Sequence, residues 1–219
     1  MTLTEIHHEL FKDFCTLKNK LIYCKKDFQR KVLKASHYPL TYSYECYTKV
    51  KKNLFNIRFT AIKRSGRKNP SVAVYGLYNR PEGIYAATLS LEEHRTTIYP
   101  PHFFKRYRER IENDFVSSNK DIIKRYFATD WGYAFSIINK EIEAVYHSFE
   151  NKSTDDKVGF VCVTSAGYCF GEAHGDNIFI MKTIVSEDML FDSQKEVFSN
   201  LRKDFIKVSK ELYGINIPN

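Results

Sequence analysis

The spacing of hydrophobic residues changes abruptly near residue 40, and this change limits the folds that the chain can adopt. Before that point, large apolar side chains recur every three or four residues, which is typical of one face of an α-helix. From Tyr42 to Tyr99 the period is two: Phe55, Ile57 and Phe59 alternate with polar residues, as in a strand with one buried face. Helical sequence followed by short alternating strands predicts an α+β protein built on an antiparallel meander sheet.

The same patterns divide the whole chain into segments. We predict an N-terminal helix over about 3–34 (capped by Thr2 or Thr4), first strands over 42–99, central helices over 101–127, later strands over 158–185 and a C-terminal helix over 193–213. Residues 131–149 fit a helix, although 133–137 also fit a strand. The polar stretch 151–156 is the one candidate boundary, and it lies between elements that could share a sheet. We therefore expect a single α+β domain over residues 1–219.

The net positive charge of the chain bears on the class of molecule that it could bind. The chain has 34 Lys and Arg against 26 Asp and Glu, a formal net charge of +8. The excess lies in the N-terminal helix, the turn around Ser65 and the C-terminal helix, which suits a nucleic acid or an acidic partner but also a plain soluble protein. The sequence contains no apolar run of about 18 residues and does not begin with a secretory leader pattern. We expect no membrane association and a cytoplasmic location.

Cysteine and histidine spacing gives little sign of a metal or a cofactor. The five cysteines are odd in number and lack a C-x-x-C pair, so we expect structural thiols in a reducing compartment. His94 and His102 are eight residues apart, and no nearby trio of carboxylates or cysteines completes a metal site. Phosphate-loop, dinucleotide-binding, zinc-protease and nucleophile-elbow patterns do not occur. The sequence therefore predicts no metal and no cofactor.

The segment that begins at Pro101 has the most distinctive set of side chains. A proline suits the first position of a helix, and we expect this helix to reach Phe115, with Asn119 capping a second one. At 100° per residue, His102, Arg106 and Glu109 fall within about 60° of one another, with Arg110 beside them. The opposite side is largely aromatic and is expected to be buried: Phe104, Tyr107, Ile111 and Phe115.

An imidazole, two guanidiniums and a carboxylate on one helix face suit phosphodiester chemistry. A histidine can move a proton near neutral pH, and an arginine can hold a phosphate through two hydrogen bonds. Glu109 would orient His102 or Arg106, and RNA brings its own nucleophile, the 2′-hydroxyl. The plain alternative is a solvated helix face in which Arg106 pairs with Glu109 or Arg110 lies in a surface ion pair, with no further function.

The run His102-Phe-Phe-Lys-Arg106-Tyr-Arg-Glu109-Arg110 resembles the H-x-x-x-R-x-x-E-R helix of small RelE-like proteins. These belong to a broader group of metal-independent ribonuclease toxins that includes barnase-like and colicin-like nucleases. The resemblance implies that a basic helix packs on an antiparallel sheet and that RNA is cut at the sheet. It also implies that His102, Arg106 and Arg110 contribute to the site with support from Glu109, and that a toxin or antiviral-defence effector of this kind has a cognate antitoxin or inhibitor.

If the resemblance holds, the later strands should supply the remaining polar groups. Thr183 is a catalytic candidate, although it also suits an ordinary β-branched strand position, and its neighbour Lys182 could simply reach solvent. His174 and Tyr168 are further candidates. We assign nucleic-acid contacts to four cations: Lys105, Lys182, Arg67 and Lys68.

Two functions follow from these observations. The first is a metal-independent endoribonuclease in which His102 is the acid and base and the arginines stabilise the phosphate. The alternative is a basic module that binds nucleic acid or an acidic protein without cutting it. RNA is the partner that we expect.

Overall fold

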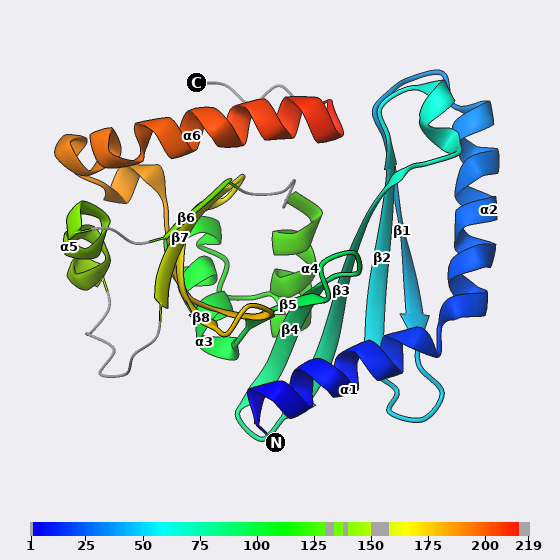
Figure 1. Ribbon diagram of the computed structural model, residues 1–219, viewed down its shortest axis with the longest axis horizontal. Coiled ribbons are helices and arrows are strands. Elements are labelled where there is room, and N and C mark those ends of the chain that lie inside the picture. Colours follow the sequence, from blue (N-terminus) through cyan, green and yellow to red (C-terminus); the bar gives the residue numbers. More distant parts are fainter. Residues whose placement is uncertain (1, 130–133, 138–139, 150–157, 215–219) are drawn as a thin grey trace.

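The computed structural model describes residues 2–129, 134–137, 140–149 and 158–214. Within these ranges the strands form one nine-stranded sheet in the order β1-β2-β3-β4-β5-β9-β8-β7-β6 (Figure 1). The strands are β1 (Leu40–Tyr47), β2 (Leu54–Ala61), β3 (Ser71–Arg80), β4 (Gly83–Ser90), β5 (Arg95–Tyr99), β6 (Ala134–Ile137), β7 (Val158–Thr164), β8 (Gly167–His174) and β9 (Ile178–Val185). The expected α+β class with antiparallel meanders is confirmed.

One parallel contact joins two antiparallel halves of the sheet. β1 to β5 form the first meander and β6 to β9 the second, and the two meet where residues 96–98 of β5 pair with residues 178–180 of β9. The pairing stops there because the chain leaves β5 at Pro100 and enters a helix. The second half of β9 consequently has no strand beside it on that side.

Two helices, and not one, form the N-terminal segment. α1 (Leu3–Cys15) begins with Thr2 and Glu5 in a reciprocal capping box, and α2 (Lys18–Lys34) follows after a short break. The expectation of one continuous helix is wrong because the chain tightens at the break, where the Leu17 amide donates to the Phe14 carbonyl at 2.9 Å. Both helices cover the same face of the first meander, and α1 crosses it at an angle to α2 (Figure 1).

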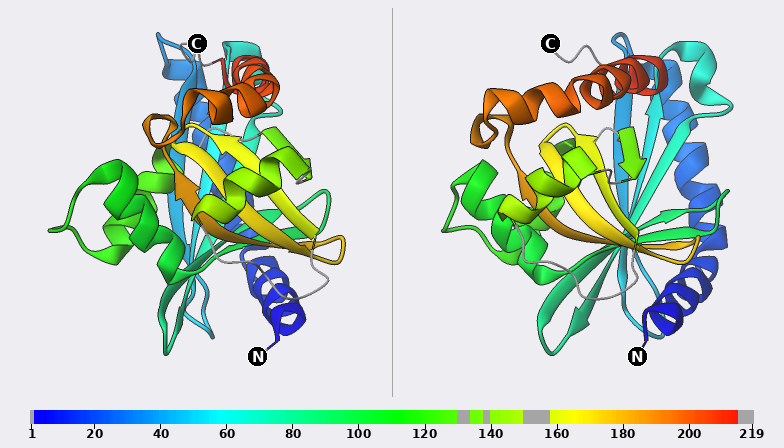
Figure 2. Two further views of the ribbon diagram at one scale, coloured as in Figure 1. Left: turned by 90° about the vertical axis from the view of Figure 1, so that its left-hand side faces the viewer. Right: turned by 60° about the vertical axis from the view of Figure 1, so that its left-hand side comes forward.

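The opposite face is covered by the central helices, α3 (Pro101–Tyr107) and α4 (Asn119–Thr129) (Figure 2). α3 continues into a single π-helical turn, η2 (Arg108–Glu112), and ends there because Asn113 adopts a left-handed conformation with φ of 53°. The helix therefore stops short of Phe115, whose side chain is 68% exposed and not buried as expected. The Ser118 hydroxyl accepts from the Asp121 amide, so Ser118 takes the capping position predicted for Asn119.

The remaining helices pack on the second half of the sheet. Residues 131–149, which fitted both a helix and a strand, contain β6 and then α5 (Lys140–Phe149), although 131–133 and 138–139 lie outside the described residues. The long helix α6 (Asp192–Tyr213) runs from β9 across to the other end of the sheet, where Gly214 lies against Ile62 (Figure 1). Short 3₁₀ turns, η1 (Arg64–Arg67) and η3 (Glu187–Met189), follow β2 and β9. No helix in the described ranges has both the length and the apolar character needed to cross a membrane.

Candidate functional site

The helix that carries the His102–Arg110 motif is fixed by its aromatic side. Pro100 and Pro101 start α3, and Phe103, Phe104 and Tyr107 are buried against the sheet and α4. The rings meet edge to face, as in the Tyr107–Tyr126 pair with centroids 5.1 Å apart. This packing sets which side of the motif is exposed.

The outer side of α3 forms a small charged group. The Arg106 Nη1 atom lies 3.2 Å from Glu109 Oε2, and the Lys105 Nζ atom lies 3.9 Å from the other carboxylate oxygen of Glu109. His102 is exposed on the same helix. The predicted proximity of Arg106 and Glu109 is present, and both side chains are partly exposed to solvent.

Arg110, on the following turn η2, contacts β9. Its Nη1 atom donates to the Thr183 hydroxyl at 2.8 Å and to the Ile184 carbonyl oxygen at 2.9 Å. Both acceptors are on the part of β9 that pairs with β8 on one side but, within the described residues, has no strand beside it on the β5 side, and Thr183 is fully buried. The guanidinium thus donates to the Ile184 carbonyl oxygen at this edge, as the backbone amide of a neighbouring strand would. The structure brings the predicted site residues Arg110 and Thr183 together.

A second ionisable group lies on β8 and β9. The Lys182 Nζ atom is 3.2 Å from Glu172 Oε2, and the His174 Nε2 atom is 3.9 Å from the same oxygen. Glu172 is only 4% exposed, and the pairing of β8 with β9 shifts register between Phe170 and Gly171. The sequence pattern indicates Lys182 and His174 as candidates but not Glu172, whose one signal is that an acid stands within a mostly apolar strand. Tyr168, the other candidate here, is buried against Phe198.

The largest concentration of charge lies elsewhere, on α2 and the turn after β2. α2 carries seven Lys and Arg against one Asp, a net charge of +6, and residues 63–68 carry four Lys and Arg with no acid. The rest of the chain holds the other 23 basic residues and 25 acidic ones, a net charge of −2. We call these eleven cations the basic surface: Lys18, Lys20, Lys25, Lys26, Arg30, Lys31, Lys34, Lys63, Arg64, Arg67 and Lys68.

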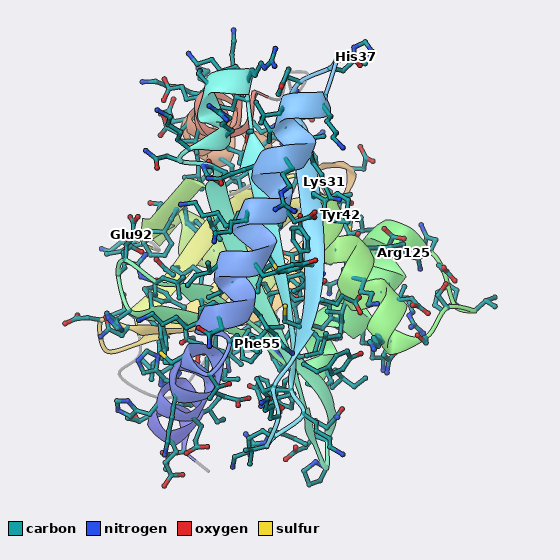
Figure 3. All side chains as sticks on the ribbon, turned by 90° about the vertical axis from the view of Figure 1, so that its right-hand side faces the viewer. Lys31, His37, Tyr42, Phe55, Glu92 and Arg125 are labelled. Atoms are coloured by element: carbon teal, nitrogen blue, oxygen red, sulfur yellow. The ribbon has the colours of Figure 1, made fainter. Side chains whose placement is uncertain are left out.

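The fold joins the two parts of the basic surface. η1 packs against α2, and Figure 3 looks onto α2 with η1 beside its C-terminal end. Lys31 is held near Asp27 at 3.1 Å and lies over the Tyr42 ring at 4.5 Å. Hydrogen bonds from the Tyr44 hydroxyl and from Lys31 keep the pKa of the Asp27 carboxyl below its usual value.

Most cations of the basic surface form no ion pair with a carboxylate of the described residues. Among the described residues, no carboxylate lies within 4.0 Å of the charged nitrogens of Lys25, Lys26, Arg30 or Lys34, nor of the four cations in residues 63–68. Of the predicted nucleic-acid contacts, Arg67 and Lys68 belong to this surface, whereas Lys105 and Lys182 are tied to the carboxylates of Glu109 and Glu172.

Comparison with protein-family models, with curated proteins and with solved structures found no match for this chain. The similarity to RelE-like proteins therefore rests on residues 102–110 alone.

Proposed function

We propose that the protein binds nucleic acid and that the phosphates lie along the basic surface. The segregation of charge carries this proposal, because eleven cations and one acid on two contacting segments account for more than the whole net charge of +8. Exposed cations without internal partners are the groups that replace condensed counterions on a polyanion. Buried or paired cations, such as Arg110 and Lys182, are not available for this role.

The length of the surface suits an extended ligand. The 17 residues of α2 span about 25 Å at 1.5 Å per residue, and η1 adds cations at one end. A duplex presents one phosphate charge about every 1.7 Å along its axis, so several phosphates would lie within reach of the side chains. A small anion would use only a fraction of these groups.

The salt dependence of binding tests this proposal. Replacing Lys25, Lys26, Arg30 and Lys34 together by glutamine should remove up to four phosphate contacts. Fluorescence anisotropy with a labelled duplex should then show a plot of log affinity against log salt whose slope is shallower by about 3 to 4, at roughly 0.9 per contact.

A comparison variant removes three cations from another helix, one fewer than the first variant. Lys203, Lys207 and Lys210 are exposed on α6, and their joint replacement by glutamine should alter the slope by less than about 1. Equal losses in the two variants would mean that overall charge, and not the basic surface, governs binding. Equal affinity of wild type for polyglutamate would favour an acidic protein partner instead.

A second candidate activity is RNA cleavage at α3. It is supported by the exposed His102 on the same helix as the Arg106–Glu109 pair. In this reaction the ribose 2′-hydroxyl attacks the adjacent phosphorus while His102 takes up its proton. His102 then returns the proton to the 5′-oxygen as the P–O5′ bond breaks, which gives a 2′,3′-cyclic phosphate and a 5′-hydroxyl. Arg106 and Lys105 would contact the phosphate, because Arg110 is engaged with β9.

Incubation of RNA with the protein in EDTA tests the cleavage. We expect cyclic phosphate ends from wild type, none with His102→Ala, and normal activity with His37→Ala, which removes an exposed histidine after α2. Intact RNA after incubation with wild type would rule out cleavage while leaving the binding proposal open to its own test.

A further inference from the structure

A cavity of about 530 Å³ opens beside the basic surface. One wall comes from α2, including Ile22 and Lys25, and the other walls come from the start of β3 and the end of β4, including Val72, Leu91 and Glu92. The β3 wall begins at Pro70, two residues after the last cation of the basic surface. Its volume falls within the range of about 300–1,000 Å³ that is usual for sites of organic ligands.

Exposed apolar side chains line part of this cavity. Ile22, Val72 and Leu91 are 49%, 47% and 41% exposed, and all three line the same cavity. Single exposed hydrophobic residues are common, but three that converge on one concavity mark a place that an apolar group can fill. Phe59, which is buried, contributes to the lining as well.

The polar groups at the rim are of two kinds. Lys25 belongs to the basic surface, and among the described lining residues Glu92 is the one carboxylate. Figure 3 shows Glu92 to one side of α2, across from the side where Lys31 and Tyr42 lie. The cavity thus has one cation, Lys25, on its α2 wall and a hydrogen-bond acceptor, Glu92, on the wall after β4.

We propose that the cavity receives an unpaired base of a single-stranded nucleic acid whose backbone lies on the basic surface. This inference rests on the proposed binding function and specifies its ligand. A base has an apolar face and a polar edge, which match the apolar walls and the rim carboxylate, and its phosphates would lie toward Lys25 and η1. A duplex keeps its bases stacked and paired, so it cannot supply this group without unpairing.

Glu92 adds a prediction about the base. A carboxylate accepts from the exocyclic amino groups of adenine, cytosine and guanine, whereas uracil and thymine lack such a group. Oligoadenylate and oligocytidylate should therefore bind more tightly than oligouridylate. Glu92→Gln should remove this preference, because an amide offers both a donor and an acceptor.

The experiment compares three ligands by anisotropy or competition: a single strand, a duplex of the same length and inorganic polyphosphate, which has the charge but no bases. Wild type should prefer the single strand. Ile22→Ser and Leu91→Ser should each weaken single-strand binding by about 3- to 12-fold, the range expected when a base no longer covers the exposed half of an aliphatic side chain, and leave duplex and polyphosphate binding unchanged.

Leu33→Ser is the matched control, because Leu33 is 40% exposed on the same helix as Ile22 but does not line the cavity. It should leave all three affinities unchanged. Circular dichroism and thermal melting establish whether each variant is folded. If Ile22→Ser does not fold, Leu91→Ser still tests the base-binding cavity.

The possible failures separate the two proposals. Equal affinity of wild type for single strand and duplex, or equal weakening of all three ligands by Ile22→Ser, would overturn the base-binding cavity but keep binding on the basic surface. Unchanged nucleic-acid binding in both serine variants would also overturn it, and would point to an apolar protein side chain as the occupant. If wild type binds no nucleic acid at low salt, the proposed function itself is refuted.

Discussion

Replacement of Arg110 by methionine tests whether this arginine of the His102–Arg110 motif stabilises the folded state. The substitution keeps most of the aliphatic stem and removes the guanidinium that donates to the Thr183 hydroxyl and the Ile184 carbonyl. A hydrogen bond from a charged donor contributes about 1.5–3 kcal/mol, and a buried acceptor left without a partner costs a similar amount. Because the two bonds share one nitrogen, we expect a loss of about 2–4 kcal/mol in the free energy of unfolding.

Arg106→Met is the internal control, since Arg106 lies four residues earlier and forms only a partly exposed ion pair with Glu109. Such a pair contributes about 0–1 kcal/mol. Urea denaturation measures the free energy of unfolding of both variants. In a chain of 219 residues, the loss expected for Arg110→Met corresponds to a fall of roughly 4–16 °C in melting temperature, which thermal melting measures.

A double-mutant cycle with Thr183→Val isolates the contact itself. If the hydrogen bond is formed, valine at position 183 should cost less in the Arg110→Met background than in wild type, by about 1 kcal/mol. Loss of RNA cleavage in Arg110→Met with an unchanged free energy of unfolding and no coupling to position 183 would refute the structural role and assign Arg110 to the reaction.

Three further changes test other parts of the structure. Burial and repulsion from His8 and His94 lower the pKa of His7, so the folded state favours the neutral ring. This ring shares a 2.8 Å hydrogen bond with the Thr96 hydroxyl. The free energy of unfolding should fall as the pH drops below about 6.5, and His7→Gln should flatten this dependence in urea titrations at pH 7.5 and 5.5. Hydrogen bonds from Ser117 and Arg125 hold the pKa of Asp114 well below its usual range. The stability that this carboxylate contributes is therefore present above about pH 4 and is lost in acid. Asp114→Asn should remove this acid-sensitive part of the free energy of unfolding. Gly171→Ala would place a methyl group on the Ile180 carbonyl oxygen and the Phe160 ring, and thermal melting should show a loss of about 1–3 kcal/mol; an unchanged melting temperature would contradict this close approach.

The sequence predicts strands well here and breaks in helices poorly. A strand with one buried face has a period of two, so each of the eight strands in 40–99 and 158–185 lies within a segment that shows this pattern or a short apolar run. The break between α1 and α2 leaves no such mark, because Phe14, Leu17 and Leu21 continue the helical spacing across it. Spacing of hydrophobic residues records which side is buried and does not record a change in the direction of the axis.

The arrangement around α3 depends on contacts that no local pattern contains. Helical spacing places Arg110 on the side of His102 but does not predict its contact with β9; the turn from Arg108 is π-helical, which changes the rotation per residue, and the Arg110 side chain donates to Thr183 of β9. The parallel contact between β5 and β9 creates the strand edge that Arg110 covers, and its two strands are more than 70 residues apart. Thr183 contacts Arg110 of the motif, and its full burial depends on the packing of the second meander, which no local pattern records.

The repulsion within α2 is the strongest physical reason to look for a ligand outside the chain. Lys26, Arg30 and Lys34 follow one another at intervals of four, a spacing at which like charges destabilise a helix by about 0.2–0.5 kcal/mol per pair. The buried side of α2 is supplied by Cys24, Phe28 and Val32, so packing does not require these cations. A glutamate in place of Arg30 would turn both repulsions into attractions. A polyanion along α2 would balance these charges from outside the chain, as the proposed binding function requires.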